Sequence, residues 1–160
     1  MKQISLTING VPVTALCSRD TLTLLEFLRG SCGVTSARPG CQTGDCGCCN
    51  VLLDDKLVCS CLVLAQKADG AKVRTLESLN SPSGELNPLQ EAFVECLAAQ
   101  CGYCTSGQLM SATALLERNP HPTREEVMEG MSGNLCRCTG YYRIVDAVLE
   151  ASRERESGGV

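Results

Sequence analysis

Hydrophobic and polar residues alternate near the start of the chain. The alternation runs over residues 3–8 and again over 11–16, and Asn9 and Gly10 separate the two segments. A period of two is typical of a strand with one buried face, and Asn-Gly is the strongest short signal for a two-residue turn. The chain is therefore predicted to open with a β-hairpin.

Two more hydrophobic segments flank a second short polar turn. Residues 50–53 and 57–60 lie on either side of Asp54 and Asp55, which predicts a second hairpin. A last strand is predicted at residues 72–75. The first half of the chain is thus expected to build one small sheet.

A helix is predicted between the two hairpins. Leu24, Leu25 and Leu28 fall on one helical face, and Asp20 or Thr21 can cap the first turn. One helix beside several short strands is the element content of an α+β unit.

Helical periodicity replaces alternation after the polar residues 80–84. Asn87 can cap a helix that has Pro88 at its first position, and Thr123 can form a capping box with Glu126. Four helices are predicted: one from Pro88, one over 105–118, one after Thr123, and one over 141–152. Four short helices indicate a small bundle.

The change from strands to helices divides the chain into two predicted domains, residues 1–79 and 80–160. Residues 154–160 are expected to form a frayed tail. The predicted fold class is α+β, with the sheet first and the helices second.

Charge and hydropathy exclude several classes of protein. The chain has 160 residues, with 14 lysines and arginines against 18 aspartates and glutamates, a formal net charge of -4. It has no basic cluster for nucleic acid or an anionic membrane, and no run of 18 apolar residues to span a bilayer. We expect neither a nucleic-acid partner nor a membrane partner.

Cysteine is the one extreme feature of the composition. There are 13 cysteines, about 8% of the chain, a level that indicates disulfides or bound metal. The count is odd and the chain does not open with a secretory signal, which favours reduced thiols in a cytoplasmic, metal-binding protein.

The first group of cysteines follows a known cluster spacing. Cys41, Cys46 and Cys49 form C-x4-C-x2-C, the plant-type 2Fe-2S spacing. Glycines let such a tight loop adopt positive φ angles and approach a cluster closely. A fourth thiolate is expected from the following hairpin, where Cys59 and Cys61 are both available. The glycines of this loop are Gly40, Gly44 and Gly47.

The second group consists of two close pairs. Cys101 and Cys104 form C-x2-C at the start of a predicted helix, where the dipole favours thiolates. Cys136 and Cys138 form C-x-C, a tighter spacing than most structural zinc sites use. Together they predict a second four-thiolate site.

These motifs, in this order, resemble the small iron-sulfur subunit of the molybdenum hydroxylases, the xanthine dehydrogenase and aldehyde oxidase family, which includes carbon monoxide dehydrogenase. The resemblance covers roughly residues 4–152. The matching segments are Gly40-Cys41-x-x-Gly44-x-Cys46-Gly47-x-Cys49, then Cys61, then Gln100-Cys101-Gly102-Tyr103-Cys104-Thr105, then Gly133-Asn134-Leu135-Cys136-Arg137-Cys138-Thr139-Gly140-Tyr141.

The resemblance implies a fold and a set of site residues. It implies a ferredoxin-like β-grasp domain followed by a four-helix domain, each with one 2Fe-2S cluster. The family spacing implies Cys61 as the fourth ligand and leaves Cys59 as an extra thiol. It also implies that Gln100 and the backbone around Cys138 contact the pterin of a neighbouring subunit. One departure is Ser106, where the family commonly has proline.

The resemblance implies electron transfer within an enzyme complex. A large molybdenum-pterin subunit would convert the substrate, and single electrons would pass through the helical-domain cluster and the ferredoxin-like cluster to FAD on a medium subunit or to an external acceptor. This chain shows no catalytic constellation and no nucleotide-binding motif of its own. A hetero-oligomer is expected.

Several alternatives remain open on the sequence. The chain could be an independent two-cluster ferredoxin, or a four-thiolate zinc or redox-sensor protein without an enzyme partner. An aromatic or N-heterocyclic substrate is favoured on family frequency, and aldehydes, purines, carbon monoxide and hydroxyaryl-CoA esters are the other candidates.

Overall fold

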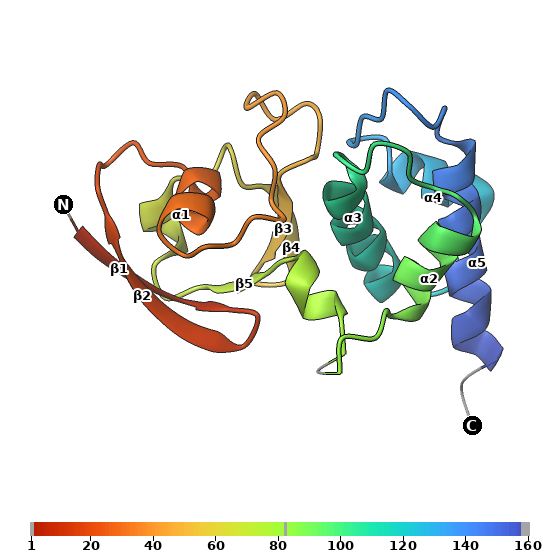
Figure 1. Ribbon diagram of the computed structural model, residues 1–160, viewed down its shortest axis with the longest axis horizontal. Helices are drawn as coiled ribbons and strands as arrows, with labels where there is room; N and C mark the ends of the chain where they lie inside the picture. Colours follow the sequence, from red (N-terminus) through yellow and green to blue (C-terminus); the bar gives the residue numbers. More distant parts are fainter. Residues whose placement is uncertain (1, 82, 158–160) are drawn as a thin grey trace.

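The protein folds as a small sheet and a helical bundle placed side by side (Figure 1). The computed structural model describes residues 2–81 and 83–157, and the side chains of 155–157 are left out of the description. We call strands β1 to β5 with helix α1 the sheet half, and helices α2 to α5 the helical half. The predicted α+β architecture, with the sheet first, is confirmed.

The sheet has five strands in the order β2-β1-β5-β3-β4. β1 pairs with β5 in parallel, and the other neighbours are antiparallel. Both predicted hairpins form, and Asn9 and Gly10 turn the first one with positive φ angles of 50° and 83°. The strands are β1 Lys2–Ile8, β2 Val11–Cys17, β3 Asn50–Leu53, β4 Lys56–Cys59 and β5 Lys72–Arg74.

Helix α1, Leu24–Gly30, covers one face of this sheet and completes its core. Leu24, Phe27 and Leu28 are fully buried against the strands. The predicted cap was wrong: Thr23, rather than Asp20 or Thr21, caps the helix. Only Thr23 lies three residues before Glu26, so the two can satisfy each other's backbone N–H groups as a capping box.

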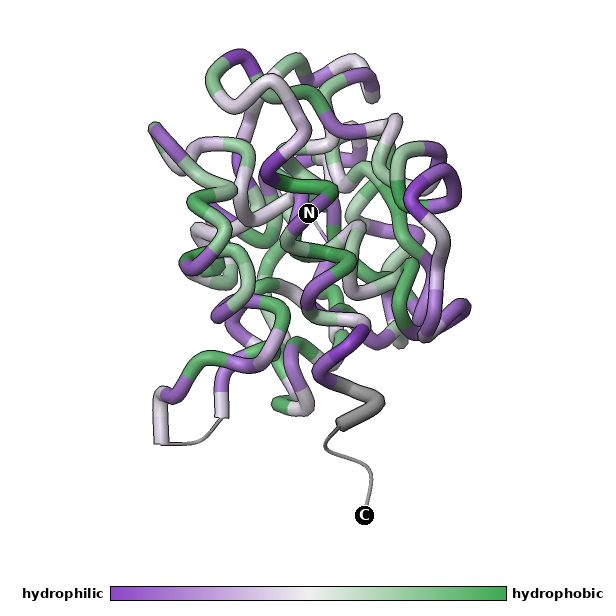
Figure 2. Tube along the Cα trace, turned by 90° about the vertical axis from the view of Figure 1, so that its right-hand side faces the viewer, coloured by the Kyte–Doolittle hydropathy of each residue, from purple (hydrophilic) through white to green (hydrophobic). Residues whose placement is uncertain are grey.

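The helical half contains the four predicted helices. Asn87 caps α2 with Pro88 in its first turn, and Thr123 caps α4 through a capping box with Glu126. Figure 2, which looks onto the helical half, shows hydrophobic and hydrophilic segments mixed along the tube, as expected for amphipathic helices. The helices are α2 Pro88–Glu95, α3 Thr105–Arg118, α4 Arg124–Gly130 and α5 Tyr142–Ser157.

Helix α5 departs from the prediction at both ends. Tyr141 has a φ of 72° and stays outside the helix, which begins at Tyr142. The helix continues to Ser157, so the predicted frayed tail is helical at its start, and residues 158–160 lie outside the described part. Two short 3-10 helices, Ala65–Ala68 and Leu76–Leu79, were not predicted.

Helix α3 joins the two halves. Met110 and Ala114 of α3 pack with Leu52 of β3 in a small core between the halves. At the far end of α3, Arg74 of β5 makes a two-pronged ion pair with Glu117, with nitrogen to oxygen distances of 2.9 and 2.7 Å. No helix within residues 2–81 and 83–157 is long and apolar enough to cross a membrane.

Candidate functional site

The cysteine loop before β3 presents two sulfurs at the surface. Cys41 is exposed and Cys46 is half-buried. Backbone N–H groups of Asp45 and Cys46 each donate to the Cys41 sulfur at 3.3 Å, and the N–H of Cys41 donates to the Cys46 sulfur at 3.2 Å. Hydrogen bonds from Thr43 lower the pKa of Cys41 to about 6. The loop is therefore built to hold negative charge on sulfur.

Glycine is required in this loop for close approach. A Cβ on Gly40 would lie 2.5 Å from the Cys46 sulfur. Gly47 has a φ of 69°, and a Cβ there would lie 2.5 Å from the side chain of Asn134 in the helical half. The predicted role of glycine is thus supported at both positions by lack of space.

Two further cysteines lie deeper at the same loop. Cys49 and Cys61 are buried, and their sulfurs interact. Burial, together with the neighbouring Cys49, raises the pKa of Cys61 to about 12. Cys59 is close as well, but its thiol donates to Asn50 Oδ1 at 3.3 Å and to the Gly44 carbonyl at 3.6 Å. Cys59 therefore behaves as a protonated donor beside the site.

The second group of cysteines comes together from two loops. The sulfurs of Cys101 and Cys138 are exposed and 3.6 Å apart. Cys104 and Cys136 form a deeper pair whose sulfurs also interact. Gln100 is exposed beside them and donates from Nε2 to the Cys138 carbonyl at 3.0 Å. These residues share one edge of the helical half, at the same end of the molecule as the first loop in Figure 1.

Hydrogen bonds also favour a thiolate in the second group. Thr139 donates to the Cys136 sulfur from its hydroxyl at 3.1 Å and from its backbone N–H at 3.4 Å. Burial by itself would raise the pKa of Cys136, but these bonds outweigh it and the pKa is lowered. Burial raises the pKa of Cys104 to about 11.

Helix α3 carries two unsatisfied buried polar groups in its first turns, close in sequence to Cys104. Gln108 is 1% exposed, and its Nε2 makes no full hydrogen bond. It lies one turn after Cys104, near enough to that thiol to oppose the rise of its pKa. Ser106, the departure from the family pattern, is also buried and its hydroxyl is unpartnered. Sequence reasoning missed Gln108, although its i, i+4 spacing from Cys104 could have indicated it.

The sulfurs lie in pairs rather than in one converging set. Among residues 2–81 and 83–157, no three or more His, Cys, Asp or Glu side chains form a group that could hold a single metal ion. Each site has an outer pair and a deeper pair. A 2Fe-2S cluster takes four cysteine thiolates shared between two irons, so the donor chemistry, the pairing and the N–H groups aimed at sulfur fit such a cluster. The pairs are Cys41 with Cys46, Cys49 with Cys61, Cys101 with Cys138, and Cys104 with Cys136.

Arg38 and Tyr103 tie the two cysteine loops to each other. Arg38 donates from its guanidinium to the Gly102 carbonyl at 2.7 Å and lies over the Tyr103 ring, 5.4 Å from its centroid. The Tyr103 hydroxyl donates to the Pro39 carbonyl at 2.7 Å. Sequence reasoning missed these contacts because about 65 residues separate their partners and no local pattern connects them.

Two family models match the chain. A 2Fe-2S iron-sulfur cluster binding domain matches residues 6–76, and a 2Fe-2S binding domain matches residues 75–149. The chain is 52% identical to the nicotine 6-hydroxylase small subunit of Paenarthrobacter nicotinovorans over 93% of its length and 88% of that protein. It is 44% identical to the nicotinate dehydrogenase small FeS subunit of Eubacterium barkeri, over 92% of this chain and 93% of that protein.

A solved structure is similar over nearly the whole chain. It is the crystal structure of quinoline 2-oxidoreductase from Pseudomonas putida 86, with a TM-score of 0.93 and 42% sequence identity. The match covers 99% of this chain and 98% of the chain in that structure.

Proposed function

This chain belongs to the small iron-sulfur subunits of the molybdenum hydroxylase family, and on that premise we propose how it conducts electrons and which substrate class its complex converts. It is an electron-transfer subunit of a multi-subunit oxidoreductase and holds two 2Fe-2S clusters. Bound 2Fe-2S clusters accept and release one electron at a time. The observation that carries the proposal is that each cysteine site has an outer pair, with at least one exposed sulfur, and a deeper inner pair.

We propose the following ligands. The first cluster would be held by Cys41, Cys46, Cys49 and Cys61, and Cys59 would remain a thiol. The hydrogen bonds of Cys59 to Asn50 and Gly44 support this choice because they use its proton. For the second cluster the ligands would be Cys101, Cys104, Cys136 and Cys138.

Electrons would enter at the helical half and leave at the sheet half. The exposed pair of Cys101 and Cys138 lies beside Gln100, whose amide nitrogen donates to the Cys138 carbonyl. The polar side chain of Gln100 and the backbone around Cys138 would contact the pterin of a partner subunit. At the other site, exposed Cys41 would face the electron acceptor, which we propose to be FAD on a medium subunit. The N–H groups aimed at Cys41 would stabilise the added electron on that side.

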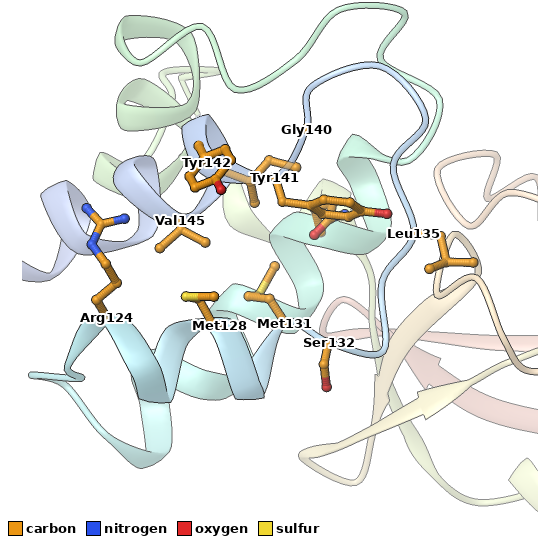
Figure 3. Close-up of a pocket in the computed structure, with 11 residues that line it drawn as sticks. Arg124, Met128, Met131, Ser132, Leu135, Gly140, Tyr141, Tyr142 and Val145 are labelled. Atoms are coloured by element: carbon orange, nitrogen blue, oxygen red, sulfur yellow. The ribbon is translucent and has the colours of Figure 1, made fainter.

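The large molybdenum-pterin subunit is proposed to cover an apolar hollow next to the second site. The hollow has a volume of about 470 Å³ and lies between α4, α5 and the segment that contains Leu135 and Tyr141. Figure 3 shows Met128 of α4 and Met131, the residue directly after α4, facing Tyr142 and Val145 of α5. Exposed large apolar side chains at such a place mark protein interfaces. The exposed fractions are 56% for Met128, 51% for Leu135 and 76% for Tyr142.

The substrate is proposed to be an N-heterocyclic aromatic compound. Nicotine, nicotinate and quinoline, after which the similar proteins are named, each contain a ring nitrogen beside ring carbons. The substrate itself would be bound by the large subunit. This chain would serve that reaction only by removing electrons singly.

Two finer assignments complete the proposal. The chain would divide into units 1–79 and 80–160, because the last strand lies before this boundary and the helices α2 to α5 lie after it. The complex is proposed to work in the cytoplasm, where thiols stay reduced.

The test uses this chain co-produced with its large and medium partners. Adding an N-heterocyclic substrate anaerobically should bleach the visible absorbance of the two clusters and produce two distinguishable paramagnetic signals. Bleaching by aldehydes, carbon monoxide or hydroxyaryl-CoA esters instead would contradict the substrate class, whereas purines are N-heterocyclic and fall within it. Recovery of a colourless protein with stoichiometric zinc would contradict the clusters, and a monodisperse monomer without a molybdenum protein would indicate an independent ferredoxin.

A further inference from the structure

We propose that Arg38 and Tyr103 form a clasp that fixes the spacing of the two cysteine sites and thereby sets the rate at which an electron passes between them. The clasp is defined by these two side chains and the backbone groups that they bond. The inference rests on the proposed electron path and adds two positioning residues to it.

The clasp acts in both directions between the halves. Arg38 reaches from the first cysteine loop and donates to the carbonyls of Gly102 at 2.7 Å and Tyr103 at 3.3 Å. Tyr103 reaches back and donates from its hydroxyl to the Pro39 carbonyl at 2.7 Å. The guanidinium also lies over the Tyr103 ring. Three polar bonds and one cation–π contact therefore join two short segments.

Each anchor lies next to proposed cluster ligands. Gly102 and Tyr103 are the two residues between Cys101 and Cys104. On the other side, the backbone N–H of Arg38 donates to the carbonyl of Cys48, which lies directly before Cys49. The clasp therefore bonds backbone groups that lie within two residues of proposed ligands in both cysteine loops.

Neither loop has regular structure to fix its position. Residues 34–41 and 99–102 lie outside the helices and strands. Loop positions of this kind depend on side-chain contacts, and one guanidinium nitrogen of Arg38, Nη1, donates to both carbonyls. Removing the clasp should allow the segment of Cys101 and Cys104 to shift relative to the first cysteine loop, while Leu135 still bonds the Cys46 carbonyl.

A small shift matters because electron transfer between two centres falls steeply with their separation. The magnetic coupling between two reduced clusters also depends on their separation, as the inverse cube. The clasp can therefore be tested by rate and by spectroscopy independently.

The structure provides a matched control. Arg74 and Glu117 also join the two halves, through a two-pronged ion pair at the far end of α3. Arg74→Gln removes an arginine contact between the halves without touching either cysteine loop. If the clasp only held the two halves together, Arg74→Gln and Arg38→Gln would have the same effect on the magnetic splitting and on the rate of electron passage.

The experiment compares the purified complex with Arg38→Gln, Tyr103→Phe and Arg74→Gln. Arg38→Gln should change the magnetic splitting between the reduced clusters and slow electron passage between them several-fold. Tyr103→Phe keeps the ring and should give a smaller change in the same direction. Arg74→Gln should leave the splitting and the rate as in wild type.

Three outcomes are decisive. Unchanged splitting and rate in Tyr103→Phe and Arg38→Gln would overturn the clasp, as would an equal change in Arg74→Gln. If Arg38→Gln does not fold, Tyr103→Phe decides alone, because Tyr103 is 45% exposed and the change removes one hydroxyl. A wild-type protein without two coupled paramagnetic centres would instead refute the proposed function.

Discussion

The backbone N–H of Leu135 donates a hydrogen bond of 3.0 Å to the carbonyl oxygen of Cys46. Leu135 directly precedes Cys136, so one hydrogen bond links a proposed ligand of one site to the neighbour of a proposed ligand of the other. Asn134 adds a weaker bond from Nδ2 to the Gly47 carbonyl at 3.4 Å. The two cysteine sites are therefore in direct backbone contact, and changes at this contact should affect both.

Gly107→Ala should disrupt this contact. A Cβ at position 107 would lie 2.1 Å from the Gly47 carbonyl oxygen. Neither atom can move away by a side-chain rotation, because the oxygen belongs to the backbone and a Cβ is bonded directly to it. We expect a loss of about 1–3 kcal/mol in unfolding free energy and weaker incorporation of both clusters. Thermal unfolding and iron content measure the two effects.

Gly30→Ala is the matched control for that change. Gly30 ends α1 and has no atom within 4 Å of an added Cβ. It should leave iron content unchanged and shift stability by about 1 kcal/mol at most. Equal iron loss in both variants would show that the Gly107 contact has no special role.

Cys61→Ser should abolish the ferredoxin-like cluster, whereas Cys59→Ser should retain it. Cys61 is buried against Cys49, and serine cannot replace its thiolate. Cys59 acts as a hydrogen-bond donor, and a serine hydroxyl can do the same. Visible absorbance and the paramagnetic signals after reduction distinguish the two clusters, and the reverse result would move the ligand to Cys59.

Gln108→Met should lower the reduction potential of the second cluster. The buried amide of Gln108 is near Cys104, and its N–H favours negative charge on that sulfur. We expect the equilibrium constant for reduction of the cluster to fall by up to about tenfold, which corresponds to ~59 mV for one electron. Unfolding stability should stay equal or rise, because an unsatisfied buried polar group is removed. A potential identical to wild type in a redox titration would contradict this role.

Tyr142→Glu should weaken assembly with the large subunit. Tyr142 is 76% exposed beside the apolar hollow of Figure 3, where a carboxylate would be costly to bury. Val11→Glu is the control, since Val11 is 61% exposed on the edge strand β2, away from that hollow. Co-purification of the large chain should drop for Tyr142→Glu only. Full recovery with both variants would place the large subunit elsewhere.

Glu77→Gln should reduce the pH dependence of stability. Burial alone would raise the pKa of Glu77, but hydrogen bonds from Ser36 and Thr75 outweigh it and lower the pKa. A lowered carboxylate pKa stabilises the fold above the unfolded value, about 4.3, and the contribution is lost as pH falls through the folded value. At pH 7 we expect the variant to be less stable by under about 1 kcal/mol, because the residue as a whole is exposed, although its carboxylate is partly desolvated, and solvent screens its charge. Denaturant unfolding between pH 7 and pH 4 tests this, and parallel pH profiles would contradict it.

Local patterns were sufficient to predict most of the elements. Asn9 with Gly10 turns the first hairpin because a two-residue turn needs positive φ angles at both positions. Thr123 with Glu126 caps α4 because both partners lie within one helical turn. The predicted cap of α1 was wrong because several polar residues precede that helix, and only Thr23 has its partner three residues later.

The cysteine spacing within each loop could likewise be read from the chain, but the assembly of the sites could not. Cys101 and Cys138 are 37 residues apart, and nothing between them specifies that their sulfurs meet at 3.6 Å. Arg38 and Tyr103 carry no signal of their contact either, since each would pass as an ordinary loop residue. Long-range contacts of this kind depend on how the two halves pack.

Helix α3 separates most clearly what is encoded locally from what is decided by packing. Its extent, Thr105–Arg118, follows from residue type and from the Asn-Pro that ends it. The burial of α3 does not follow from its residue types, because the polar residues Ser106, Gln108 and Ser111 would be expected to face solvent. They are buried because α3 lies between the sheet and the other helices, so every face of the helix meets protein. Composition and spacing thus determine that the chain builds two cysteine sites, and only the packing of the two halves around α3 decides that those sites touch.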